Sequence, residues 1–278
     1  MEISASMVKQ LRDLTGAGIM DCKKVLVECD GDQQKAVEAL RKRGAELADA
    51  RAGRAASEGL IVCQISENRQ IGALIEVNCE TDFVSRGDAF RNFALPLGAL
   101  ALSINEDCNE ISALNEMSFN ANGQTVEEAR LEIVGKIREN IALRRMTVFK
   151  AAPDNIIGSY VHRERMGILT EVSGDSNGDL ADDLAVHVAV MKPQWLDTEN
   201  IPSDVIDKEK EIYLDQARAS GKPEYVLERI IEGKIKKFSN ENTLLNQAYY
   251  EDEDKTVQAI LDENKTSASR FCLLELGK

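Results

Sequence analysis

The chain has 278 residues, enough to bury a sizeable hydrophobic core in one large or two ordinary domains. Its formal net charge of −14 argues against direct contact with nucleic acid, because such contact relies on Lys and Arg neutralising phosphates. The longest nearly apolar run, residues 93–102, is shorter than the about 20 residues that a membrane-spanning helix needs. We therefore expect a globular protein whose partners are proteins, not nucleic acid or a membrane.

Cysteine usage and the amino-terminal sequence indicate the compartment. The six cysteines include no C-x-x-C pair, and the chain does not start with a charged segment followed by an apolar one. We therefore expect a reduced, cytoplasmic protein. The charge is uneven, since residues 1–54 hold 10 Lys and Arg against 9 Asp and Glu, whereas the rest holds 24 against 39. This could steer the two parts toward different partner surfaces, although a solvated face of mixed charge is the simpler interpretation.

Residues 4–44 predict three short helices. The first begins at Ser4 as a cap and ends at Gly16 and Gly18, the second begins at Asp21, and the third begins after Asp32 and ends at Gly44. Their apolar stripes are formed by Met7, Leu11 and Leu14, by Cys22, Val25, Leu26 and Cys29, and by Ala36, Val37 and Leu40. Together these stripes predict a small three-helix core. Residues 45–57 are predicted to be a helical or frayed linker, with a domain boundary near 54–57.

Residues 60–65 and 71–77 are β-rich runs separated by a short turn, which predicts a hairpin. The stretch from Asn78 to Arg86 then places a carboxylate, Asp82, beside a large aromatic, Phe83. Binding residues gather in loops held by a rigid sheet, so Phe83 is a candidate contact residue. The alternative is that its ring folds back into the core, and periodicity alone does not separate the two.

A second hairpin is predicted at residues 157–162 and 166–172, with its turn at 163–165. Its second strand, GILTEV from Gly167 to Val172, matches GALIEV from Gly72 to Val77 at Gly, Leu, Glu and Val. Similar sequences at equivalent positions of two predicted hairpins indicate a duplicated unit of hairpin plus helix.

Between the hairpins, residues 88–103 predict an apolar helix kinked at Pro96, and residues 105–122 predict a loop or irregular helix. Thr125 opens a capping box, and the helix after it is predicted to carry Ile133, Ile137 and Ile141 on one face. Residues 143–149 are predicted to form the strand that closes the first unit.

The second half of the chain is predicted to be mostly helical. Asp182 or Asp183 leads into a helix around His187, and this helix ends before Lys192. We expect His187 to be a core histidine. Residues 202–220 predict one helix, and residues 221–223 predict a turn. The next helix carries an apolar stripe formed by Leu227, Ile231, Ile235 and Phe238. Together the two helices predict an antiparallel helical hairpin. A helix at 256–264 and a final strand at 269–276 complete the prediction.

Candidate catalytic chemistry is sparse. The chain has two histidines, His162 and His187, too few for a convincing triad or histidine metal site. The glycines at 16 and 18 lack the rest of a dinucleotide fingerprint. Cys79 is a weak nucleophile candidate, because neighbouring carboxylates raise the pKa of a thiol. We expect no enzyme activity, no cofactor and no metal site.

Two stretches resemble a known family. Leu14 to Lys24, which reads LTGAGIMDCKK, is similar to the amino-terminal motif of bacterial elongation factor Ts, and Thr81 to Val84, which reads TDFV, is similar to that family's signature loop. Shorter matches at 159–162, 187–189 and 236–238 extend the resemblance over nearly the whole chain. Members of this family are guanine nucleotide exchange factors for elongation factor Tu.

The resemblance implies an α+β fold with three parts. Residues 1–54 would form a three-helix ubiquitin-associated-like domain, residues 55–155 a first core subdomain, and residues 156–278 a second core subdomain. The two subdomains would be repeated α/β units with antiparallel strands. The helical hairpin, at about 200–238, would be inserted in the second subdomain. In the family it serves self-association in some members and partner contact in others. The first of these roles allows a homodimer here.

The resemblance also implies a function and a set of contact residues. The protein would bind elongation factor Tu with GDP and promote exchange of GDP for GTP by disturbing the magnesium and phosphate site. The residues that match family contact positions are Ile19, Met20, Lys23, Thr81, Asp82, Phe83, Val84 and His162. Simpler interpretations remain open: Met20 as a core residue, His162 as an ordinary hairpin residue, and the whole protein as an adaptor without exchange activity. Residues 240–249 depart from the family pattern, with Ala248 where a Pro is common.

Overall fold

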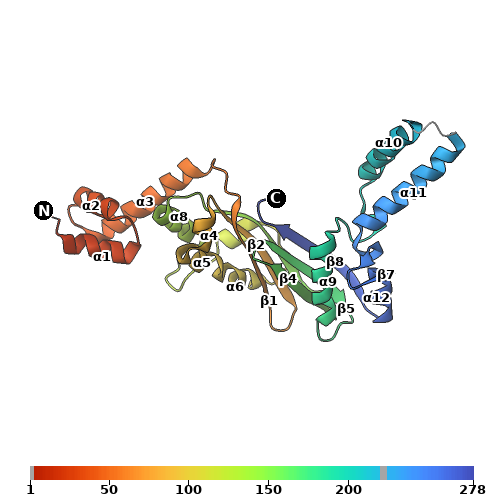
Figure 1. Ribbon diagram of the computed structural model, residues 1–278. Helices are drawn as coiled ribbons and strands as arrows, with labels where there is room; N and C mark the ends of the chain where they lie inside the picture. The colour runs from red at the N-terminus through yellow and green to blue at the C-terminus, as the bar shows by residue number, and fades with distance from the viewer. Residues whose placement is uncertain (1–2, 220–223) are drawn as a thin grey trace.

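The computed structural model describes residues 3–219 and 224–278 of the chain. The protein has an α+β fold and an elongated shape, with a group of short helices at the amino-terminal end, sheets in the middle and a protruding pair of helices beyond them (Figure 1). Within the described residues, the strands form two three-stranded sheets and one two-stranded sheet. None of the described helices is both long and apolar enough to cross a bilayer.

The three amino-terminal helices pack on one another as expected; they are α1 (Ala5–Thr15), α2 (Ile19–Glu28) and α3 (Gln33–Arg51). The side chain of Ser4 accepts a hydrogen bond from the amide of Met7 at the start of α1, and Asp32 caps α3 in the same way. Gly16 ends α1 with a φ of +68°, a left-handed conformation that glycine adopts without strain. The small core beneath them contains Val8, Leu11, Cys22, Val25, Leu26 and Ala36.

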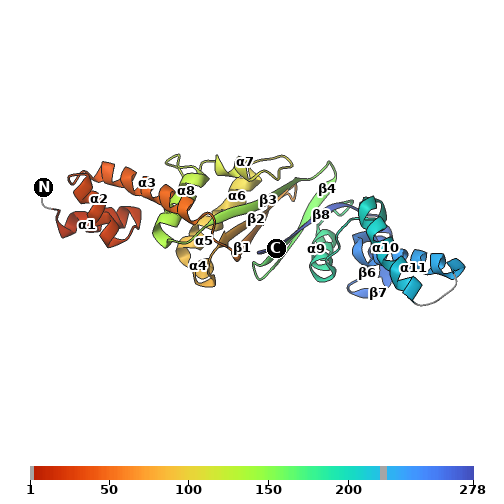
Figure 2. The same cartoon turned by 90° about the horizontal axis from the view of Figure 1, so that it is seen from above.

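Three details of this region correct the sequence prediction. Leu14 is 69% exposed, because the buried face of α1 runs through Val8 and Leu11. Helix α2 begins at Ile19, which puts Asp21 inside its first turn, where a carboxylate interacts favourably with the helix dipole. Helix α3 does not end at Gly44 but continues to Arg51, and its second half packs against the core of the protein (Figure 2).

The first three-stranded sheet consists of antiparallel strands in the order β1-β2-β3, namely β1 (Glu58–Ile65), β2 (Ile71–Cys79) and β3 (Ala142–Lys150). The predicted hairpin is confirmed, since β1 and β2 pair along their length. Helices associated with this sheet are α4 (Asp82–Arg86), α5 (Asp88–Ala94), α6 (Pro96–Leu102), α7 (Ile111–Asn115) and α8 (Val126–Ile137). Pro96 starts a new helix instead of kinking one. The Thr125 capping box is confirmed, but Ile141 lies beyond the end of α8.

The second three-stranded sheet has the order β4-β5-β8, namely β4 (Asn155–His162), β5 (Met166–Ser173) and β8 (Ser267–Glu275). Helices α9 (Asp179–Met191) and α12 (Val257–Glu263) pack against it. Helix α9 starts before Asp182, contrary to the prediction, because Asp175 accepts hydrogen bonds from the amides of Gly178 and Ala181 and so sets the first turn. The short pair β6 (Ala248–Tyr249) and β7 (Asp252–Thr256) was not predicted.

The helical hairpin consists of α10 (Ser203–Ala219) and α11 (Glu224–Asn242), which pack against each other and extend away from the sheets (Figure 1). Ser220 and the predicted turn at 221–223 lie outside the described residues. Two short 3₁₀ helices, η1 (Thr198–Asn200) and η2 (Leu244–Asn246), flank the hairpin where it joins the rest of the protein.

The two three-stranded sheets meet through matching glycines. A Cβ atom added at Gly72 would lie 2.7 Å from Cγ2 of Ile157, and one added at Gly167 would lie 2.6 Å from Cγ2 of Ile61. Any side chain at these positions would therefore force the sheets apart. Buried apolar residues from both sheets, including Leu74, fill the interface. The sheets consequently form one continuous scaffold.

Candidate functional site

Phe83 is the most exposed large apolar side chain described, with 85% of its surface accessible. The stretch around it forms one short helix, α4, instead of an irregular loop. Thr81 is the N-cap, and its hydroxyl accepts a hydrogen bond from the amide of Val84 at 3.4 Å. Val84 packs partly against the core, while Asp82 forms an exposed ion pair with Arg86 at 3.2 Å. The ring of Phe83 thus points into solvent, while Val84 packs the same helix against the core.

The carboxylate of Glu139 holds the start of α4. Its Oε2 accepts hydrogen bonds from the amides of Glu80 and Thr81, both at 3.1 Å, and its Oε1 accepts one from the Thr81 hydroxyl at 2.7 Å. Hydrogen bonds to a charged group are stronger than those between neutral groups. Three of them converge on the two residues that precede α4.

Glu80 makes the reverse connection. Its carboxylate accepts from the amide of Asn140 at 2.7 Å, from Arg51 at 3.1 Å and from Arg54 at 3.4 Å. The backbone hydrogen bond from Asn140, followed by the two guanidinium groups, lowers the pKa of Glu80. Glu80 therefore links the end of α3 to the strand exit that carries Phe83.

His162, the candidate contact residue in the second half of the chain, is exposed at the end of β4. Its Nδ1 lies 3.2 Å from the Tyr160 hydroxyl. The turn that follows is fixed to the first sheet. Glu164 forms two hydrogen bonds of 2.7 Å with Arg91 of α5, the helix next to α4. Arg165 pairs with Glu58 of β1 at 2.8 Å. The structure thus joins the turn after His162 to α5 and β1, which lie beside α4.

The amino-terminal candidates lie on the surface of α2. Ile19 is 52% exposed and Met20 is 75% exposed, so the interpretation of Met20 as a core residue is wrong. Lys23 is also exposed. Val27, which is 56% exposed and lies eight residues after Ile19 on α2, extends this area, which we call the N-terminal surface: Ile19, Met20, Lys23 and Val27. Exposed apolar clusters of this kind are typical of protein interaction sites.

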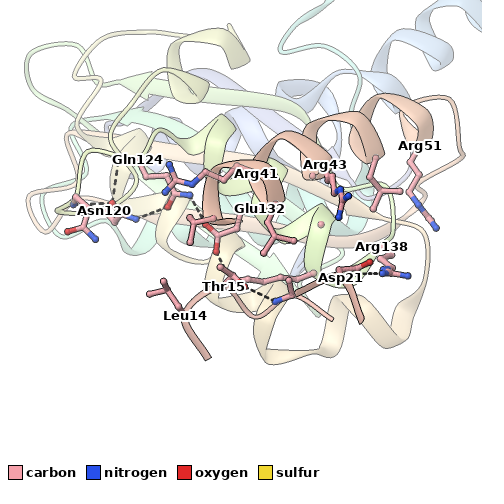
Figure 3. A pocket seen from close by; sticks show the side chains of 18 residues that line it. Leu14, Thr15, Asp21, Arg41, Arg43, Arg51, Asn120, Gln124, Glu132 and Arg138 are labelled. Atoms are coloured by element: carbon pink, nitrogen blue, oxygen red, sulfur yellow. Dashed lines mark hydrogen bonds and ion pairs between the residues drawn. The ribbon is translucent and has the colours of Figure 1, made fainter. Parts of the chain in front are cut away.

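A cavity of about 660 Å³ lies between the amino-terminal helices and α8 (Figure 3). Beside it, α3 and α8 approach closely at two glycines, since a Cβ added at Gly44 would lie 2.9 Å from the carbonyl oxygen of Leu131, and one at Gly135 would lie 3.4 Å from Cα of Gly44. An ion pair between Arg138 and Asp21 crosses the cavity rim from the end of α8 to α2. The amino-terminal helices are therefore connected to the core by direct packing as well as by the chain.

Neither Cys79 nor His187 is suited to catalysis. Burial raises the pKa of the Cys79 thiol to about 12, so the reactive thiolate is scarce at neutral pH. His187 is fully buried, with its Nδ1 accepting from the amide of Tyr250 and its Nε2 lying 3.0 Å from Gln247. The prediction of a satisfied core histidine is confirmed. In the ranges 3–219 and 224–278, no group of three or more acidic, His and Cys residues is placed to hold a metal ion.

The sequence did not point to Glu80, Glu139 or Asn140. The partners of Glu139 lie 58 and 59 positions away in the chain, so no local spacing reports the contact. The only sequence signal is that Glu80 directly precedes the TDFV stretch.

The fold and the site define an interaction protein: an α+β scaffold of packed sheets that presents exposed apolar side chains at two separate places. The family model described as Elongation factor TS matches residues 80–278. Elongation factor Ts of Hydrogenovibrio crunogenus is 41% identical over 278 residues, which cover all of this chain and 92% of that relative. Those of Alkalilimnicola ehrlichii and Methylococcus capsulatus are each 44% identical over 278 residues, covering all of this chain and 93% of each relative. The chain belongs to the elongation factor Ts family, which confirms the resemblance seen in the sequence.

Proposed function

We propose that this protein binds elongation factor Tu with GDP and promotes the exchange of GDP for GTP. Family membership supports the proposal. The observation that carries it is the 85% exposed ring of Phe83 on α4, a helix whose start is held by hydrogen bonds to Glu139. An exchange factor needs no covalent chemistry. It needs only to bind the nucleotide-free partner more tightly than the GDP-bound one, and GDP then weakens the factor's binding by the same ratio.

The proposed mechanism uses Phe83 as a wedge at the magnesium and phosphate site of the partner. Burying a Phe side chain contributes about 1.5–3 kcal/mol. Shifting a two-state equilibrium from 1:99 to 99:1 requires roughly 5.5 kcal/mol of differential binding, so one ring is not enough. We assign the remainder to Thr81, Asp82 and Val84 around the ring, to the N-terminal surface and to His162. The contacts between the Glu164 turn and Arg91 support a concerted action of Phe83 and His162.

We also propose the domain division that accompanies this function. Residues 1–54 would be a ubiquitin-associated-like docking domain, followed by repeated core subdomains at 55–155 and 156–278. The repeat is supported by the sheets, in which β2 and β5 each form the middle strand and each carry one register shift, after Glu76 and after Glu171. The paired glycines at 72 and 167 support it further.

The helical hairpin is proposed as a second interaction element, either for a homodimer or for contact with the partner. Ile212 on α10 is 48% exposed, which leaves apolar surface for such a contact. Sedimentation of the free protein, and of its mixture with elongation factor Tu, distinguishes the two roles.

Mixing this protein with elongation factor Tu that carries fluorescent GDP tests the proposed function. Acceleration of GDP release over the spontaneous rate is the expected result. The alternative function, an adaptor that binds through the N-terminal surface, is favoured by the exposure of Met20 and Ile19. An adaptor would bind its partner and leave the GDP release rate unchanged.

A further inference from the structure

The three residues after α8 connect the two surfaces that we assign to partner contact. Arg138 pairs with Asp21 of α2, next to Met20 of the N-terminal surface. Glu139 accepts three hydrogen bonds from the residues that precede α4. The amide of Asn140 donates to Glu80, and its side chain donates to the carbonyl of Arg54 at 2.9 Å.

These contacts differ in strength. The pair between Arg138 and Asp21 is solvent exposed, with side-chain exposures of 56% and 36%, and exposed pairs contribute little because water and salt screen them. Glu139 is half-buried and binds two backbone amides and a hydroxyl through both of its oxygens. Hydrogen bonds to a charged acceptor are stronger than those between neutral groups, and the shortest of the three, from the Thr81 hydroxyl, is 2.7 Å. Glu139 is thus the main anchor of the segment.

The anchor acts on the residue that aims Phe83. Thr81 is the N-cap of α4, so its position sets where the helix begins and in which direction the side chain at its second position points. Helix α4 has 5 residues, none of them fully buried, and Val84 is its apolar contact with the core. A helix of this length is unstable without outside contacts.

We propose that Glu139 is a positioning residue that orients α4 so that Phe83 is presented to the partner before binding. This inference rests on the proposed exchange function. A preorganised wedge does not have to be ordered at the moment of binding, so more of its burial energy is available to displace the nucleotide. Loss of the anchor should therefore lower the maximal exchange rate more than the affinity for the partner.

Glu139→Gln is the most specific test. A glutamine has nearly the same size but keeps only one acceptor oxygen and places an amide donor where Glu139 now accepts a hydrogen bond. We expect the maximal rate of GDP release at saturating factor to fall about tenfold, which corresponds to about 1.4 kcal/mol of barrier. The half-saturating concentration of the factor should change less than about twofold. Hydrogen exchange of the amides in residues 80–86 of the free protein should become faster.

A double-mutant cycle separates positioning from general damage. If Glu139 acts through Phe83, adding Glu139→Gln to Phe83→Ala should lower the maximal rate little further, because there is no ring left to position. Full additivity of the two losses, or an unchanged maximal rate in Glu139→Gln, would overturn the inference. Glu67→Gln, which changes an exposed carboxylate in the β1–β2 turn, is the matched control and should behave like the unmodified protein.

The outcomes distinguish this inference from the function on which it rests. If the unmodified protein does not accelerate GDP release, both fail. If it does, and Phe83→Ala slows release while Glu139→Gln does not, only the positioning role fails. Should Glu139→Gln lose the far-ultraviolet circular dichroism of the folded protein, Glu139→Asp replaces it in the same cycle, since it keeps the charge but withdraws the carboxylate from Thr81.

Discussion

Glu76 of β2 lies directly opposite Arg145 of β3, and its buried Oε2 accepts a hydrogen bond from Arg145 Nε at 2.6 Å. The same relationship recurs in the other sheet, where Glu171 of β5 is paired with Arg270 of β8. In both sheets the register shifts at the residue that follows the glutamate. In each sheet, a buried glutamate paired with a partly exposed arginine therefore lies at the register shift and ties the middle strand to an outer strand.

Glu76→Ala should destabilise the protein. The carboxylate of Glu76 also accepts a hydrogen bond from the amide of Gly277 at 2.8 Å, so its removal releases the carboxy-terminal residues as well. Burial opposes ionisation, but the hydrogen bonds from Gly277, Asn78 and Arg145 outweigh it and lower the pKa of Glu76. We expect a loss of about 1.5–3 kcal/mol in the free energy of unfolding, measured with urea. Glu67→Ala, at an exposed carboxylate, should change it by less than about 0.5 kcal/mol.

His187 should make stability depend on pH. Burial lowers the pKa of His187, against the opposing effect of Gln247, so the folded protein resists protonation. The unfolded chain takes up that proton once the pH falls below about 6.5. The contribution of His187 is therefore complete above that pH and is lost on acidification, with a slope of at most about 1.4 kcal/mol per pH unit.

Urea unfolding at pH 7.0, 6.0 and 5.5 measures this dependence. The His187→Gln variant, which cannot titrate in this range, should show a shallower decline than the unmodified protein. Equal slopes in the two proteins would contradict the assignment. Burial is the main cause that raises the pKa of the neighbouring Asp183 carboxyl. Asp183 titrates in both proteins, so its contribution to the pH dependence cancels in the comparison.

Gly44→Ala should loosen the contact between α3 and α8. The added methyl group would lie 2.9 Å from the Leu131 carbonyl oxygen, which is backbone and cannot move aside freely. Overpacking of this kind costs about 1–3 kcal/mol, more than the gain in helix propensity of about 1 kcal/mol from replacing glycine. We expect a lower midpoint of thermal unfolding. At Gly53 an added Cβ meets nothing within 4 Å, so Gly53→Ala should leave the midpoint nearly unchanged.

Local features of the fold are predictable from the sequence. Both hairpins, the caps at Ser4 and Asp32 and the capping box at Thr125 involve residues close in the chain, and the structure contains all of them. Exposure was harder to predict. Leu14 continues an apolar stripe yet lines the cavity beside α8, because the buried face of α1 runs through Val8 and Leu11.

The surroundings of the site were not predictable in this way. The TDFV stretch is recognisable by resemblance, but periodicity alone left open whether Phe83 was buried. The hydrogen bonds from Thr81 and Glu80 to Glu139, and from Asn140 to Glu80, join segments about 60 positions apart, which only the tertiary fold brings together. A single sequence carries no spacing that reports such a contact.

Met20→Ser should weaken binding to elongation factor Tu without changing the exchange step. Met20 is 75% exposed on α2, and burial of such a side chain contributes about 1.5–3 kcal/mol. Because this surface is assigned to docking, we expect the half-saturating concentration of the factor to rise about tenfold in stopped-flow GDP release. The maximal rate should stay the same. A lower maximal rate at unchanged half-saturation would contradict the docking role.

The most direct test of the account is the rate at which saturating Phe83→Ala releases GDP from elongation factor Tu. We predict a rate about 10- to 100-fold below that of the unmodified protein, because the burial energy of the ring is lost from the exchange step. Its free energy of unfolding should be unchanged, since the ring is 85% exposed in the free protein. Val190→Ala, which shortens a side chain that is 60% exposed on α9, serves as the control and should release GDP at the unmodified rate. A Phe83→Ala protein that releases GDP as fast as the unmodified one would contradict the wedge mechanism.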